Sequence, residues 1–175
     1  MPSGKAHDRI TWVTAALATP IWYFASPVRD VAAFAAGMIG YLFSGLYLSS
    51  DLDTRSGPLK RWGPLRFLWY PYQRLVPHRS WLSHGLGIGP IARAIYFVAM
   101  VWLLARGALW LIDKWLLPVD RNAILARGAL ALATFVWRHP VWAEWTVGGL
   151  VLGGVAHSLA DAIVSGTKKT WKRIW

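Results

Sequence analysis

The stretch VAAFAAGMIGYLFSGLYL, residues 31–48, is an apolar run without a single charged side chain. Its length approaches the roughly 20 apolar residues that an α-helix needs to cross the hydrocarbon core of a bilayer. Similar runs occupy residues 10–25, 91–112 and 141–164, the first of which is short and contains Pro20. Together they predict an all-α integral membrane protein, a helical bundle with about four transmembrane helices.

A fifth apolar stretch, residues 123–137, is shorter and contains Arg127. We expect it to form an interfacial or re-entrant helix on the far side of the membrane. Two arginines accompany the third run: Arg93, expected to extend its charge outward to the membrane surface, and Arg106, expected near the far interface or paired. The first run is expected to be retained, because Tyr23 stands where signal-peptide cleavage requires a small residue.

The composition agrees with a membrane protein that has basic flanking loops. The 175 residues, most simply one membrane-embedded domain (1–175), are 55% hydrophobic and include 13 Trp, yet the formal net charge is +11. Nucleic acid is not expected as a partner, because apolar stretches interrupt the positive charge and no basic arm or helix forms. Membrane lipids are the expected partners.

The distribution of Lys and Arg predicts the orientation of the chain. Cations are concentrated before the first run, between the second and third runs, and in a basic C-terminal tail at 165–175. The turn between the first two runs has only Arg29, next to Asp30. Because basic loops stay in the cytoplasm, four spans with both termini cytoplasmic satisfy the charge distribution.

Residues 54–90 form a basic, aromatic loop. Prolines at 58, 64, 71 and 77 exclude a continuous helix through its first part. Trp62, Trp69, Tyr70 and Tyr72 alternate there with cations, a pattern typical of a loop in the lipid headgroup layer. A loop packed on the helical bundle is an equally good interpretation, and the two are compatible.

Histidines and carboxylates collect at the cytoplasmic ends of the predicted spans. There is no cysteine, so any metal site must use imidazole nitrogen and carboxylate oxygen. The predicted topology brings to one face the pairs His7 and Asp8, Asp51 and Asp53, His78 and His84, and His157 and Asp161. On the opposite side it places His139, Asp30, Asp113, Asp120 and Glu144.

The local spacing of these pairs suits convergence on a metal. His157 and Asp161 share a helix face one turn apart, and Asp51 and Asp53 point to one side if their segment is extended. Each pair also has a simpler interpretation. His7 could be a solvated residue, the two aspartates could cap a turn, and His157 and Asp161 could hydrogen-bond between helices.

The motifs SGKAHDRIT (3–11), SSDLDTR (49–55), HRSWLSHG (78–85) and HSLAD (157–161) resemble a family of small bacterial membrane proteins described as metal-binding. That family is similar in turn to the membrane-bound metal-dependent hydrolases, and its ligand set is similar to that of zinc-dependent phospholipases C. The resemblance implies a bacterial inner or internal membrane and a divalent transition metal, with zinc expected. It implies the ligands His7, Asp51, Asp53, His78, His84, His157 and Asp161.

Seven ligands are more than one tetrahedral ion requires. They could bind two ions and still leave coordination positions open for water. A hydrolase acting on a phosphoester or other lipid-like substrate would follow, with Asp53 or Asp8 as general base. Arg79 would contact the substrate phosphate, or extend to lipid headgroups instead. An alternative is a non-catalytic subunit of a larger membrane complex with a structural metal. A transporter is the weakest interpretation, because the spans lack charges along a path.

Overall fold

A computed structural model describes residues 4–25, 30–77, 80–85 and 88–174, without the side chains of residues 4–6, 25, 81, 84, 161, 162 and 164–174. Within this part of the chain the regular elements are all helical, which confirms the all-α prediction at that level. The elements are α1 (Gly4–Ala25), α2 (Val31–Leu46), η1 (Ser50–Asp53), α3 (Gly57–Arg61), η2 (Gly63–Trp69), α4 (Tyr70–Leu75), α5 (Trp81–His84), α6 (Ile88–Trp115), α7 (Arg121–Arg138) and α8 (Pro140–Ile174).

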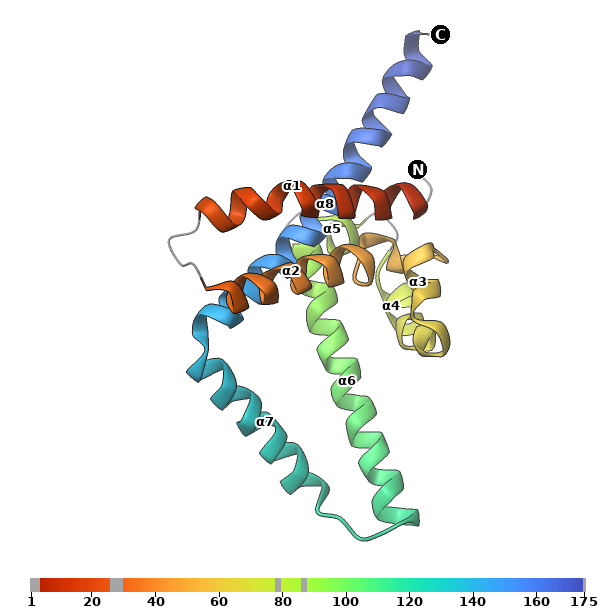
Figure 1. Ribbon diagram of the computed structural model, residues 1–175. Coiled ribbons are helices and arrows are strands. Elements are labelled where there is room, and N and C mark those ends of the chain that lie inside the picture. The colour runs from red at the N-terminus through yellow and green to blue at the C-terminus, as the bar shows by residue number, and fades with distance from the viewer. Residues whose placement is uncertain (1–3, 26–29, 78–79, 86–87, 175) are drawn as a thin grey trace.

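Helices α2 and α8 form the central pair, with α1 packed on both (Figure 1). Glycines allow this close approach. A Cβ atom on Gly149 would lie 1.9 Å from the carbonyl oxygen of Gly37, and one on Gly153 would lie 2.2 Å from that of Tyr41. Neither distance is sterically possible, so this helix crossing requires glycine at both positions of α8. The spacing Gly149-x-x-x-Gly153 is the small-residue pattern typical of tightly packed membrane helices.

Helices α6 and α7 form a hairpin that extends away from this central pair. In Figure 1 they descend from a layer in which α1 and α2 run across the view. From Ala94 to Arg138 no residue is buried, although α6 is strongly apolar. At the tip, Asp113 and Arg121 form an ion pair at 3.3 Å, and the Lys114 ammonium lies over the ring of Trp110. The hairpin is therefore an exposed apolar arm with a polar tip.

The loop between α2 and α6 folds into a small cap with its own core. Prolines stand in the first turns of α3, η2 and α4, where proline favours a helix start, so the predicted interruption of the helix is confirmed. Its core is formed by Leu48, Leu52, Leu59, Leu68, Trp69 and Tyr72. Trp69 and Tyr72 are thus buried, so the packed interpretation of this loop describes its aromatic core better. Tyr70 and the cations Arg55, Lys60, Arg66 and Arg74 remain exposed.

The four-span bundle is not confirmed. By length and hydropathy, two segments of the described chain could cross a membrane, residues Val31–Asp53 and Ile88–Trp115. In α1, the polar residues around His7 lower the hydropathy of the helix. The stretch at 123–137 is a regular helix, α7, that returns from the hairpin tip to α8. The predicted tail at 165–175 continues α8 through Ile174.

Candidate metal centre

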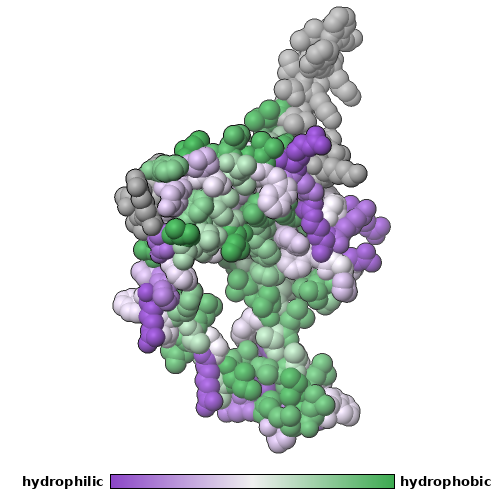
Figure 2. Space-filling model, viewed as in Figure 1, coloured by the Kyte–Doolittle hydropathy of each residue, from purple (hydrophilic) through white to green (hydrophobic). Residues whose placement is uncertain are grey.

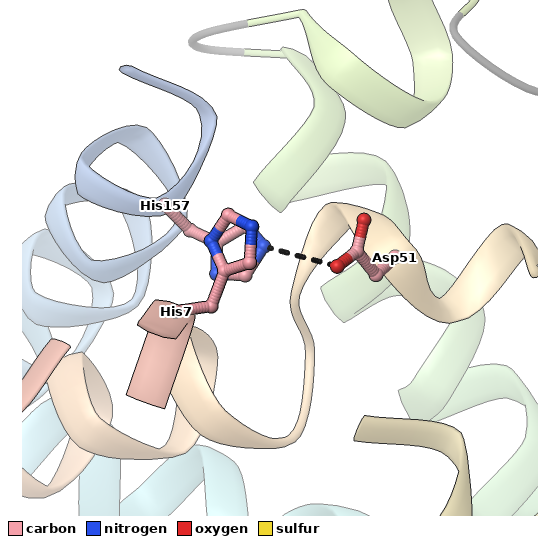
Figure 3. A group of neighbouring side chains, drawn as sticks. All are labelled: His7, Asp51 and His157. Carbon is pink, nitrogen blue, oxygen red and sulfur yellow. Dashed lines mark ion pairs between the residues drawn. The ribbon is translucent and has the colours of Figure 1, made fainter. Parts of the chain in front are cut away.

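Three segments that are distant in the sequence place His7, Asp51 and His157 side by side. His7 lies in the second turn of α1, Asp51 in η1 directly after α2, and His157 on α8. Each offers one ligand atom, and these atoms all lie within 4.8 Å of one another. The Nε2 atom of His157 is 3.8 Å from the Oδ2 atom of Asp51. Figure 3 shows both imidazoles beside the Asp51 carboxylate.

The two imidazoles lie in the interior of the protein and stack on each other. Their ring centroids are 4.3 Å apart with an interplanar angle of 25°. His7 is 3% exposed, His157 is 2% exposed, and the Asp51 side chain retains 14% of its accessible surface. Polar groups removed from water to this extent need strong local partners, because their hydration is lost. This burial argues against the interpretation of His7 as a solvated surface residue.

Helix packing explains why His157 reaches this position. Gly153 is four residues before His157, so both lie on the face of α8 that packs against α2. On the other side, a Cβ atom on Gly45 of α2 would lie 2.6 Å from the Thr11 side chain of α1. Thr11 is four residues after His7 and donates its hydroxyl to the carbonyl of His7 at 3.1 Å. The close contacts that α2 makes with α8 at Gly153 and with α1 at Gly45 therefore position both histidines.

The geometry expected for the Asp51–Asp53 pair is wrong. Residues 50–53 form the short 3₁₀-helix η1 rather than an extended segment. Successive side chains of a 3₁₀-helix are about 120° apart, so residues two apart diverge instead of sharing a side. Asp51 belongs to the group with His7 and His157, whereas Asp53, 8% exposed, acts electrostatically on Arg93 and Tyr72.

Asp8 is engaged elsewhere. It forms an ion pair with Arg61, which also donates to the carbonyl of Leu46 at 2.6 Å. This contact ties α1 to α3 and to the end of α2. Because its carboxylate is held by Arg61, Asp8 lies outside the group formed by His7, Asp51 and His157.

Four of the predicted site residues lie wholly or partly outside the described part of the chain. His78 and Arg79 lie outside the described residues. His84 ends α5 and Asp161 follows His157 by one turn of α8, but the side chains of both are outside the description. On the opposite side, His139 caps the end of α7 and stacks on Trp142 at 4.8 Å, apart from the group of three.

The sequence analysis missed the role of Arg93. The guanidinium is fully buried rather than extended to the surface. Its Nε donates to the carbonyl of Leu48 at 2.6 Å, and its Nη1 donates to the carbonyl of Ser83. Leu48 lies just before the turn that carries Asp51, and Ser83 directly precedes His84. Arg93 thus connects two segments that carry predicted ligands.

Tyr72 lies beside this arginine. Burial raises the pKa of its phenol, and the nearby positive charge of Arg93 partly opposes that increase. The phenol therefore remains neutral and cannot balance the charge of Arg93. The carbonyls of Leu48 and Ser83, together with the carboxylates of Asp51 and Asp53, provide the negative potential around it.

The donor set of His7, Asp51 and His157 fits a divalent transition metal. Two imidazoles and one carboxylate are ligands that zinc and its neighbours accept, at metal–ligand distances of about 2.0–2.2 Å. Ligands of one tetrahedral ion lie about 3.3–3.6 Å apart at such bond lengths, so small shifts would bring these atoms into range. Each imidazole lone pair lies in its ring plane, so binding one shared ion also requires a ring rotation.

Comparison with known proteins agrees with this donor set. The model of a family described as "Uncharacterized metal-binding protein (DUF2227)" matches residues 2–171. A protein of Aquifex aeolicus (strain VF5), described as "Uncharacterized protein", is 39% identical over 59 residues. That alignment covers 33% of this chain and 41% of the relative, so the chain matches less than half the length of that protein. No solved structure matches the chain significantly.

Proposed function

The chain belongs to this family of metal-binding proteins, and we propose that His7, Asp51 and His157 form the core of its metal site. The observation that carries the proposal is the convergence of these three side chains from α1, η1 and α8. His78, His84 and Asp161 would complete the coordination, whereas Asp53, which diverges from Asp51 in η1, would not be a ligand. His84 and Asp161 support this extension by their position, since α5 contacts η1 and Asp161 lies one turn beyond His157.

We propose a divalent transition metal, with zinc as the first candidate and two ions as the favoured number. The nearly parallel rings support two ions. The lone pair of each imidazole lies in the plane of its ring, and the two ring centroids are 4.3 Å apart. Two ions, one bound by each ring, would therefore lie at a separation close to the value of about 3.5–4 Å that is found in two-metal sites. The carboxylate of Asp51 lies beside both rings and could bridge such a pair.

We further propose that the α6–α7 hairpin inserts into a membrane. None of its residues from Ala94 to Arg138 is buried, and α6 is 28 residues or about 42 Å long, enough to cross the hydrocarbon core. Trp110, Lys114 and Trp115 at the tip suit the far interface. The metal site and the basic cap would then lie together at the near interface, which the charge distribution assigns to the cytoplasm.

A metal-dependent hydrolase at this interface is the activity that the arrangement favours. A bound divalent ion would supply Lewis acidity towards a substrate oxygen and water. Asp53 would accept a proton as general base, and Arg79 would hold a phosphate. The predicted substrate is a phosphoester or another lipid-like compound that reaches the site from the membrane.

The burial of both histidines favours a second function, a structural metal in a subunit of a membrane complex. Structural sites have closed coordination shells, whereas catalytic sites keep a position open for water. A metal bound by α1, η1 and α8 would link the two ends of the chain to its middle. Exposed tryptophans such as Trp137 would provide contacts for partner proteins.

One experiment separates the two functions. The purified, metal-replete protein is assayed on phosphoester, acyl-ester and amide lipids, next to Asp53→Asn and His157→Ala, and X-ray absorption reports the ligands of the metal. The hydrolase proposal requires turnover that falls at least about 100-fold in Asp53→Asn while the metal is retained. A bound metal with a complete protein shell and no turnover would instead support the structural function.

A further inference from the structure

A cavity of about 580 Å³ opens in the cap formed by residues 54–77. Its lining includes four cations, each from a different segment: Arg55 follows η1, and Lys60, Arg66 and Arg74 come from α3, η2 and α4. Tyr70 and Gln73 complete the polar lining. In Figure 2, hydrophilic side chains gather on the side of the molecule where α3 and α4 lie in Figure 1. The cations therefore converge through folding rather than through sequence proximity.

Among the described residues, the four cations have no acidic counterpart. Within the described part of the chain, no carboxylate lies within ion-pair distance of any of them, and the cavity lining contains none. By contrast, the neighbouring Arg61 is paired with Asp8. Four like charges around one cavity repel each other, and an anionic ligand in the cavity would relieve that repulsion.

The cavity also has a defined position relative to α6 and to the proposed metal site. The Tyr96 hydroxyl of α6 donates to the carbonyl of Leu68, and the ring of Trp69 packs on Tyr96 at 5.3 Å. Gln73, in the wall, donates to the carbonyls of Leu52 at 2.9 Å and Thr54 at 3.2 Å, on either side of Asp53. The cavity therefore adjoins both the start of the apolar arm and the aspartate segment.

We propose that this cavity binds the phosphate group of an anionic ligand. Arginine is suited to phosphate because its planar guanidinium offers paired N–H donors, and three of the four cations are arginines. Lys60 adds a flexible point charge, and the Tyr70 and Gln73 side chains add polar contacts. A phosphorylated lipid headgroup and a soluble phosphate share this chemistry. No proposed metal ligand lines the cavity, so the two sites share no residue.

The test is calorimetric titration of the full chain in a non-ionic detergent. The probes are inorganic phosphate and dihexanoyl phosphatidic acid, and dihexanoyl phosphatidylcholine serves as the zwitterionic reference. The double variant Arg66→Gln/Arg74→Gln removes two of the lining charges. Its matched control, Arg127→Gln/Arg138→Gln, removes the same charge from α7. We expect at least about a tenfold loss of affinity in the first and less than about a twofold change in the control.

The outcomes are distinguishable. Saturable binding of phosphatidic acid alone assigns a lipid headgroup, and comparable binding of inorganic phosphate assigns a soluble ligand. Absence of saturable binding of both anions, or an equal loss in both double variants, overturns the proposal. Unchanged metal content in Arg66→Gln/Arg74→Gln shows that the protein is folded and that the result is separate from metal binding. If this variant does not fold, Arg55→Gln/Lys60→Gln provides the same comparison.

Discussion

The Nε2 atom of His157 lies 3.8 Å from the Oδ2 atom of Asp51, although one residue belongs to the last helix and the other to a turn after the second. His7 joins them from the first helix. A contact of this kind depends on the packing of α8 against α2 and of α1 on both. The metal centre and the helix core are therefore coupled, and changes in either should affect the other.

Loss of either member of this pair should remove the metal. We expect Asp51→Ala and His157→Ala to reduce the metal bound after purification to less than about a tenth of the wild-type amount, because each removes a proposed ligand atom. Inductively coupled plasma mass spectrometry measures the content. His139→Ala, at the α7–α8 junction, should retain the wild-type amount. Full metal content in His157→Ala would show that the three residues are not the ligand core.

Substitution of Arg93 should lower both the stability of the protein and its affinity for the metal. Arg93→Met leaves two buried carbonyls, those of Leu48 and Ser83, without their donor, at a cost of about 1–3 kcal/mol each. The summed cost of about 2–6 kcal/mol corresponds to a decrease in melting temperature of roughly 4–24 °C. We also expect weaker metal binding. The control Arg106→Met removes an exposed guanidinium that lies over Trp102 and should change little. Equal effects of the two substitutions would contradict the role assigned to Arg93.

Two alanine variants of α8 test the close contact between α2 and α8. In Gly153→Ala the new methyl group would meet the Tyr41 carbonyl at 2.2 Å, so α2 and α8 must separate and His157 must move. We expect a loss of roughly 1–3 kcal/mol of stability and a lower affinity for the metal. Gly148→Ala, where nothing lies within 4 Å, should be neutral or slightly stabilising. Thermal unfolding and metal titration of both variants test this difference.

Membrane insertion of α6 can be tested by introducing one charged residue near the middle of this helix. Leu103 is 50% exposed near the middle of α6, and an aspartate at a membrane centre costs about 2.5–3.5 kcal/mol. Leu103→Asp should therefore shift the protein out of the carbonate-resistant membrane fraction. Leu65→Asp, at a residue of η2 that is 46% exposed, is the matched control and should not. If both variants remain in the membrane fraction equally, α6 is not the anchor.

Several local features could be predicted because they depend on neighbouring residues alone. The helical runs, the proline-interrupted cap and the absence of thiolate ligands follow directly from residue types and spacing. The convergence of His7, Asp51 and His157 was expected for a different reason, since it was inferred from a four-span topology that is not confirmed. The Gly149-x-x-x-Gly153 spacing was a readable signal for the helix crossing and was overlooked.

The amino-acid sequence by itself determined the helices, the chemical types of the ligands and the basic character of the cap. Only the tertiary structure decided which of these groups meet. The turn that separates Asp51 from Asp53, the inward direction of Arg93 and the gathering of four cations around one cavity each depend on contacts between distant segments. The periodicity of apolar residues predicts which face of a helix is buried. The angle at which two helices cross depends on which side chains, or glycines, meet at their interface.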